Sequence, residues 1–230
     1  LVFFNIIDLC KIYKISHLLY ASTSSVYGLS NKRILSEEDE VDHPIQFYAA
    51  TKRSNELIAH SYSYLYNLPT TGLRFFTVYG PWGRPDMALF IFTKNMIANK
   101  SIDVFNKGNH ERDFTFIDDV ARSVFKVSKE IPKKKKFLKN KYKPDESIAP
   151  FRILNIGNNK PIKLMKYIKS IEKNLNKVAN KNYLPLQMGD IKRTLSNNKK
   201  IKKLINFRPN TPVQKGINRF INWYKEYYNV

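Results

Sequence analysis

The sequence predicts an α/β fold, namely a doubly wound parallel sheet that lacks its first strands, together with a smaller α/β lobe. Segments rich in β-forming residues alternate with segments of helical periodicity, which is typical of parallel strands joined by helices. Residues Val2 to Tyr13 already show the pattern of a helix, and no glycine-rich turn follows a predicted strand. We therefore expect the chain to be the later part of a longer protein with a parallel sheet. From Met87 the pattern changes to shorter elements, and we expect the second lobe to begin there.

The elements of the first half follow from apolar spacing and turn residues. Apolar side chains recur at helical spacing up to Tyr66, and Pro69 stops that helix. Four hydroxyl residues, Ser22 to Ser25, directly follow an apolar strand. The predicted elements are a helix over Val2–Tyr13, a strand over His17–Ala21, a helix over Tyr48–Tyr66, a strand over Thr71–Phe76 and a glycine- and proline-rich loop over Thr77–Pro85.

The second half is predicted to mix short strands with helices. One helix begins at Asp118, with that residue as its N-cap, and the last helix has Thr211 as its N-cap and Pro212 at its first position. Residues 130–150, which hold a lysine run and prolines, are expected to form a flexible insertion. The remaining elements are helices over Met87–Ala98 and Lys163–Leu175 and strands over Ile102–Phe105, Asp113–Ile117 and Arg152–Ile156.

Composition narrows the classes of function. The single cysteine, Cys10, excludes an intramolecular disulfide, and the four histidines show no ligand spacing, so no metal site is expected. No apolar run approaches the ~20 residues that span a bilayer. The formal net charge is +21, and the positive charge comes mostly from lysine, which indicates a compositional bias of the sequence. A basic protein also suits an anionic small substrate. We expect a cytoplasmic protein without membrane or nucleic-acid partners; a basic nucleic-acid-binding module is the alternative from a different class.

The hydroxyl residues and a Tyr-x-x-x-Lys pair are the parts needed to take a proton from an alcohol. Tyr48 and Lys52 lie one helical turn apart. The hydroxyls lie upstream at a strand end, where open α/β sheets bind their ligands. A hydride acceptor beside these groups would give alcohol–ketone chemistry on a sugar-like substrate. On spacing alone, the alternative is an amphipathic helix with a solvated lysine.

Longer motifs carry a family resemblance. Residues Leu73–Leu89 read LRFFTVYGPWGRPDMAL, and the shorter matching segments are Ala21–Gly28, Tyr48–Lys52, Arg112–Asp119 and Leu154–Gly157. With these segments the chain resembles the extended short-chain dehydrogenase/reductases, in particular NAD-dependent nucleotide-sugar epimerases and dehydratases of the UDP-glucuronate 4-epimerase type. The likeness covers nearly the whole chain. The chain has no segment that matches the family's N-terminal glycine-rich turn, which binds NAD.

The resemblance implies a domain organisation and a reaction. Residues 1–86 would be the later part of a Rossmann-type NAD-binding domain, and residues 87–230 mainly a nucleotide-sugar lobe, interleaved with Rossmann elements near 112–160. The implied cofactor is NAD, the substrate a UDP-sugar and the assembly a homodimer. The implied reaction, in surface-polysaccharide synthesis, converts UDP-glucuronate to UDP-galacturonate by oxidation at C4, rotation of the keto intermediate and hydride return. A 4-epimerase of a neutral UDP-hexose is the alternative enzyme.

The resemblance also implies catalytic roles. Tyr48 would be the catalytic base, Lys52 its partner that also binds the nicotinamide ribose, and Thr23 a hydrogen-bond partner of the sugar 4-oxygen. Related dehydratases have Asp and Glu where this chain has Ser24 and Ser25, and related decarboxylases have Glu at the second position. Two serines cannot serve as carboxylate acid/base groups, which indicates redox chemistry without elimination.

Three further residues are candidates for binding anions. Arg84, in a loop rich in glycine and proline, suits a two-pronged contact with phosphate or carboxylate. Arg112 matches the family's arginine on the nucleotide diphosphate. Thr77, Arg84 and the serine pair Ser24 and Ser25 are expected to surround the sugar carboxylate of a glucuronate-type substrate.

Overall fold

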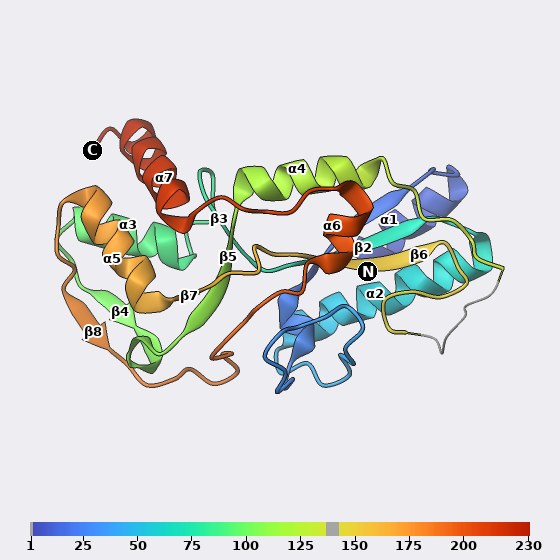
Figure 1. Cartoon of the computed structure of the whole chain (residues 1–230), viewed down its shortest axis with the longest axis horizontal. Helices are drawn as coiled ribbons and strands as arrows, with labels where there is room; N and C mark the ends of the chain where they lie inside the picture. The colour runs from blue at the N-terminus through green and yellow to red at the C-terminus, as the bar shows by residue number, and fades with distance from the viewer. Residues whose placement is uncertain (1, 137–142) are drawn as a thin grey trace.

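A three-stranded parallel sheet forms the centre of the first part of the molecule (Figure 1). The computed structural model describes residues 2–136 and 143–230. The sheet has the order β1-β2-β6, with β1 (Leu18–Thr23), β2 (Thr70–Phe75) and β6 (Phe151–Ile156). Thr23 lies opposite Phe75 in the register, and Phe75 opposite Ile156. Because all three strands run in one direction, their carboxyl ends meet at one edge of the sheet.

Helices cover both faces of this sheet. The helices on one face are α1 (Val2–Ile12) and α2 (Phe47–Tyr66), and those on the other are α4 (Ile117–Ser128) and α6 (Lys199–Ile205). Neighbouring side chains of β6 point to opposite faces, so Ile153 packs with α1 and α2 whereas Leu154 packs with α4 and α6. Burial on both faces explains why apolar residues of this strand point to either side of the sheet.

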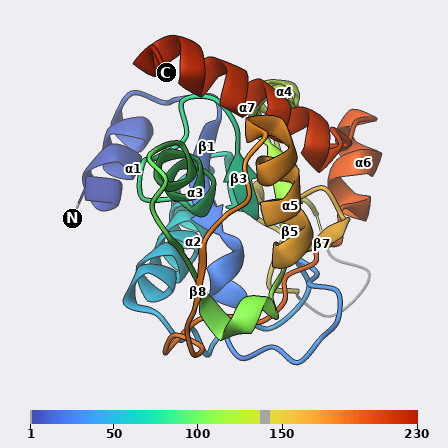
Figure 2. The same cartoon turned by 90° about the vertical axis from the view of Figure 1, so that its left-hand side faces the viewer.

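The second part of the molecule has shorter strands and its own core. The strand pairs are β5 (Glu111–Phe116) with β3 (Thr77–Tyr79) in parallel, β5 with β7 (Pro161–Lys163) antiparallel, and β4 (Ile102–Val104) with β8 (Lys181–Tyr183) in parallel. The helices of this part are α3 (Ala88–Ile97), α5 (Leu164–Leu175) and α7 (Val213–Tyr228), whose ribbons are seen in Figure 2. They pack around a core rich in aromatic side chains. In this core the rings of Phe114 and Tyr167 stack with centroids 4.0 Å apart.

The predicted α/β class with a parallel, doubly covered sheet is confirmed, and most predicted helices and strands lie within two residues of the observed ones. Three short strands were not predicted: no strand was assigned to the stretches of β7 and β8, and Thr77–Tyr79, predicted as part of a loop, is β3. Its pairing partner β5 lies more than thirty residues later, so the glycines and prolines that follow β3 dominated the local pattern. The division at residues 86 and 87 stays a prediction.

Two predicted helix caps are wrong. The N-cap of α4 is Phe116, and Asp118 lies inside the first turn, where the helix dipole still stabilises a carboxylate. The N-cap of α7 is Pro212 rather than Thr211. The reason lies in a long-range contact, because the Asp119 carboxylate accepts a hydrogen bond from the Thr211 N–H at 2.8 Å and fixes the chain just before α7.

The predicted flexible insertion over residues 130–150 is wrong for its later part. Asp145 and Ala149 are each only 2% exposed. The Asp145 carbonyl oxygen accepts a hydrogen bond from the Ile153 N–H at 2.9 Å, and its carboxylate forms an ion pair with Lys200. Residues 143–150 are therefore packed onto β6 and α6. Residues 137–142 of the predicted insertion lie outside the described residues.

Two findings concern the described residues as a set. None of their helices is both long and apolar enough to cross a bilayer. They also contain no group of three or more histidine, cysteine, aspartate and glutamate side chains arranged to hold a metal ion.

Gly216 of α7 provides a test of the packing between α7 and the strands. A Cβ at this position would lie 2.2 Å from Tyr79 Oη and 2.7 Å from the Phe116 ring. In an exposed helix, Gly→Ala stabilises by about 1 kcal/mol. Here we expect Gly216→Ala to lower the free energy of unfolding by about 1–3 kcal/mol, because backbone or rings must move. Urea denaturation measures this. The exposed neighbour Lys215→Ala should change it by less than about 0.5 kcal/mol, and a stabilised Gly216→Ala would contradict the packing.

Candidate active site

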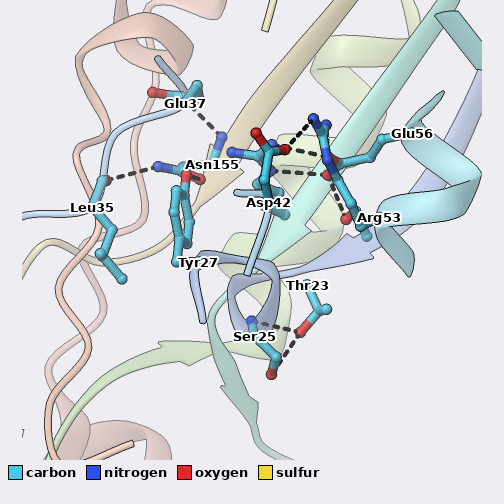
Figure 3. Close-up of polar contacts among 11 residues, drawn as sticks. Thr23, Ser25, Tyr27, Leu35, Glu37, Asp42, Arg53, Glu56 and Asn155 are labelled. Atoms are coloured by element: carbon cyan, nitrogen blue, oxygen red, sulfur yellow. Dashed lines mark hydrogen bonds and ion pairs between the residues drawn. The ribbon is translucent and has the colours of Figure 1, made fainter. Parts of the chain in front are cut away.

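At the carboxyl end of β1 the chain enters a tight turn, Thr23–Tyr27, which we call the hydroxyl turn. Thr23 Oγ1 accepts a hydrogen bond from the Ser25 N–H at 3.2 Å and donates one to Ser25 Oγ at 3.3 Å (Figure 3). Gly28 follows the turn with a φ of +52°, and a Cβ there would lie 2.0 Å from the His43 carbonyl oxygen. The turn therefore holds its hydroxyl groups at the edge of the sheet.

The first turns of α2 bring Tyr48 and Lys52 to the same edge. Residues four apart on a helix share one face. Lys52 Nζ donates a hydrogen bond to the Ala21 carbonyl oxygen at 3.2 Å and lies 5.7 Å from the centroid of the Tyr48 ring. The Tyr48 side chain itself is about half exposed. The ammonium is thus held against β1, while the phenol is open to a ligand.

A cleft of about 660 Å³ lies where the sheet edge meets the second part of the molecule. Six predicted site residues line it, namely Thr23, Ser24, Ser25, Tyr48, Thr77 and Arg84. Aromatic residues of the second core, including Phe90 and Tyr167, line the rest. Lys52 does not line the cleft, but its ammonium donates a hydrogen bond to the carbonyl oxygen of Ala21, which does. The position is the one where parallel sheets bind ligands, and the chemical roles of these residues stay predictions.

Among the described residues that line the cleft, Arg84 is the cationic one. Its guanidinium is exposed and makes two hydrogen bonds to the Asp86 carboxylate, one of them from Nε at 3.0 Å. Asp86, and to a smaller extent the nearby Tyr48, raise the pKa of Arg84 above its ordinary value. Arg84 therefore remains charged beside the phenol, in a geometry that a ligand anion could share with Asp86.

Arg112 does not line this cleft. Its Nη2 donates a hydrogen bond to Asp190 Oδ1 at 2.7 Å, and its side chain is largely buried. Burial lowers the pKa of Arg112, and the charge of Asp190 opposes that effect. No local pattern indicated Asp190 as the partner, since the two residues are 78 positions apart. The structure thus separates Arg112 from the other predicted site residues.

A buried polar network beneath the cleft was missed by sequence reasoning. It consists of Ser22 on β1, Glu56 on α2 and Arg74 on β2, all at most 2% exposed. Glu56 accepts hydrogen bonds from Ser22 Oγ at 2.7 Å and from Arg74 Nε at 2.9 Å. The only local signal was that Glu56 follows Lys52 by one helical turn, and a glutamate on a helix is typically solvated.

Comparison with known proteins fits this arrangement. Residues 1–138 match the NAD dependent epimerase/dehydratase family. The chain belongs to this family. It is 53% identical over 229 residues to an uncharacterized 37.6 kDa protein of Escherichia coli O111:H-, covering 99% of this chain and 69% of that protein. It is 42% identical over 230 residues to a probable UDP-glucuronate 4-epimerase of Rhizobium meliloti, covering 97% of this chain and 66% of that protein.

A solved structure gives the same result for the fold. UDP-glucuronic acid 4-epimerase from Bacillus cereus, in complex with UDP-glucuronic acid and NAD, matches with a TM-score of 0.83 and 31% identity. The match covers 96% of this chain and 65% of that one. The chain thus spans about two thirds of the length of each of these proteins. The family resemblance seen in the sequence is confirmed.

NAD is the cofactor of the family, and part of the site fits its nicotinamide end. An ammonium has three N–H donors, and among the described residues Lys52 uses one, on Ala21. Its remaining donors suit ribose hydroxyls, and the half-exposed Tyr48 phenol lies beside them. The 230 residues contain no Gly-x-Gly-x-x-Gly turn, the motif that binds a dinucleotide pyrophosphate at a helix N-terminus.

The buried network should make stability depend on pH. Burial alone would raise the pKa of Glu56, but the hydrogen bonds and charge of Arg74, with help from Ser22 and Arg53, hold that pKa below its ordinary value of 4.5. Ionised Glu56 therefore stabilises the fold above pH 4.5, and this contribution is lost as the pH falls through the lower folded pKa.

We expect Glu56→Gln to lower the free energy of unfolding by about 3 kcal/mol at neutral pH, because Arg74 keeps a buried charge without its partner. The difference from wild type should shrink in acid, where the wild-type carboxylate is protonated as well. Guanidinium chloride unfolding across the acidic range measures this. A difference that does not vary with pH would show that Glu56 is not ionised in the folded state.

Proposed function

We propose that the protein expressed from its complete gene is a 4-epimerase that interconverts UDP-glucuronate and UDP-galacturonate. The observation that carries the proposal is the cleft, in which Tyr48 and the hydroxyl turn face the cationic Arg84. No carboxylate belongs to the described residues that line this cleft. The substrates named for the Rhizobium relative and the Bacillus structure support the choice of UDP-glucuronate.

In this proposal Tyr48 takes the proton from the sugar 4-hydroxyl. The Lys52 ammonium lies 5.7 Å from the centroid of the Tyr48 ring and places a positive charge beside the phenol. Thr23 Oγ1 hydrogen-bonds the same sugar oxygen from the end of β1. NAD, when bound, supplies a reversible hydride acceptor. Tyr48 then returns its proton to the 4-oxygen when the sugar is reduced again.

Ser24 and Ser25 restrict the chemistry to C4. A serine hydroxyl can donate a hydrogen bond to the sugar, but at neutral pH it is not ionised and does not remove a proton from carbon as a carboxylate does. No other acidic side chain of the described cleft could replace it. The proposal therefore includes neither loss of water nor loss of carbon dioxide.

Arg84 and Thr77 would bind the sugar carboxylate. The exposed guanidinium of Arg84 can exchange the Asp86 carboxylate for a carboxylate of the ligand, because either carboxylate can accept the same pair of hydrogen bonds. The bond to Asp86 also supports the alternative, a neutral UDP-hexose, since it already satisfies much of the charge of Arg84.

Replacement of the phenol tests the catalytic role. Tyr48→Phe should lower kcat by about 10²- to 10⁴-fold, the usual effect of removing a positioned general base, while the Kd of the UDP-sugar stays close to wild type. Thr23→Val should lower kcat by about tenfold, because it removes one hydrogen bond. NMR of the sugar products measures turnover. Tyr64→Phe, an exposed phenol on the same helix, is the control, and full activity of Tyr48→Phe would refute the role.

A charge test separates the two substrates. Arg84→Leu should raise the KM for UDP-glucuronate about tenfold, the effect of losing one charge-assisted hydrogen bond, and change the KM for UDP-glucose much less. The exposed Arg208→Leu controls for the general loss of positive charge. Equal losses for both substrates would assign Arg84 to the diphosphate and favour the neutral-hexose alternative.

A further inference from the structure

The Glu56 carboxylate connects α2 to two strands at once. Its Oε1 accepts hydrogen bonds from Ser22 Oγ at 2.7 Å and Arg74 Nε at 2.9 Å, and its Oε2 accepts one from Arg74 Nη2 at 2.9 Å. Ser22 directly precedes Thr23, and Glu56 follows Lys52 by one turn of α2. The contact therefore joins β1 and α2 next to Thr23 and one helical turn after Lys52.

Arg74 extends the contact to the hydroxyl turn. Its guanidinium lies 4.9 Å from the centroid of the Tyr27 ring, and Tyr27 is the last residue of that turn. The Tyr27 hydroxyl donates to Asn155 Oδ1 at 2.7 Å, and Asn155 Nδ2 donates to the Leu35 carbonyl oxygen at 3.0 Å (Figure 3). Arg74 thus contacts α2 through Glu56 and the hydroxyl turn through Tyr27.

This network is charged, although its surroundings are buried. Burial would lower the pKa of Arg74, but Tyr27 and Glu56 outweigh burial and hold it above the ordinary value. Apolar side chains of similar volume would often stabilise the fold equally well or better. A planar guanidinium that donates two parallel hydrogen bonds, however, binds its carboxylate in a defined orientation. The ion pair therefore supplies direction, which apolar packing does not.

We propose that Ser22, Glu56 and Arg74 are positioning residues that set the placement of Tyr48 relative to the hydroxyl turn. Glu56 and Arg74 do not line the cleft, and Ser22, which does, is only 2% exposed and donates its hydroxyl hydrogen to Glu56. The three residues act by fixing α2, β1 and the hydroxyl turn against one another. For its kinetic readout the inference rests on the proposed function. A displacement of about 1 Å of a reacting group can cost 10²-fold in rate, so a small movement of α2 suffices.

Ser22→Ala tests the proposal with the smallest change, since it removes one hydrogen bond and leaves the ion pair intact. Ser63→Ala is the matched control, because Ser63 is equally buried on α2 and donates to the Leu68 carbonyl oxygen at 2.8 Å, at the other end of the helix. Both variants should lower Tm. Only Ser22→Ala should lower kcat, by about tenfold, with KM unchanged. Equal kcat values for the two variants would overturn the proposal.

A double variant separates positioning from stability. Glu56→Leu with Arg74→Met replaces the ion pair by apolar groups, which is often neutral for stability. We expect a folded protein whose kcat is lower by about 10- to 100-fold, with little change in KM. A purely structural role predicts wild-type kcat once stability is retained, and that result would overturn the proposal. If the double variant does not fold, Ser22→Ala against Ser63→Ala decides alone.

Amide hydrogen exchange provides a readout that does not need catalysis. In Ser22→Ala, the amides of residues 51–56 should exchange faster while those near Ser63 keep their wild-type rates, and in Ser63→Ala the pattern should reverse. A wild-type protein without turnover of any UDP-sugar would refute the proposed function, and the exchange pattern would still decide the positioning role. Unchanged exchange at residues 51–56 in Ser22→Ala would overturn it.

Discussion

A carboxylate and a guanidinium without access to solvent, Glu56 and Arg74, cross the interface between α2 and the central strand of the sheet. The apolar clusters on either face of the sheet provide most of the burial, but hydrophobic contact is not directional. The ion pair is directional, and loss of one partner leaves a buried charge. It therefore fixes the register of α2 on the sheet, and with it the position of Tyr48 and Lys52.

The cleft lies on a seam between two parts of the molecule, and a second buried carboxylate secures that seam. Asp113 at β5 accepts hydrogen bonds from the backbone N–H groups of Asn158, Asn159 and Ser196 at 2.9, 3.0 and 2.9 Å. These groups belong to the chain after β6 and to the segment before α6. The sheet edge with its hydroxyl turn and the aromatic wall of the second part are thus held at a defined distance.

Sequence reasoning found what local pattern encodes. Alternation of strands and helices gave the fold class, and neighbouring residues gave the hydroxyl turn and the pair Tyr48 and Lys52. It failed where a charged side chain has a distant partner, because charge in a helix or strand normally indicates solvent. Glu56 is buried by residues of other elements, and Arg112 is paired with Asp190, a partner that no local pattern indicated, while its role in binding stays a prediction. Such pairings depend on the folded chain and leave no local periodicity.

The central claim is that the cleft oxidises and reduces one sugar carbon without acid/base chemistry at its neighbour. The most direct test converts UDP-glucuronate in D₂O with the protein expressed from its complete gene, and records ¹H NMR of the UDP-galacturonate formed. The account predicts a product with ordinary hydrogen at both C4 and C5, because the hydride returns to C4 and no carboxylate removes the C5 proton. Deuterium at C5 would contradict the role of the serine pair, and deuterium at C4 would contradict hydride return.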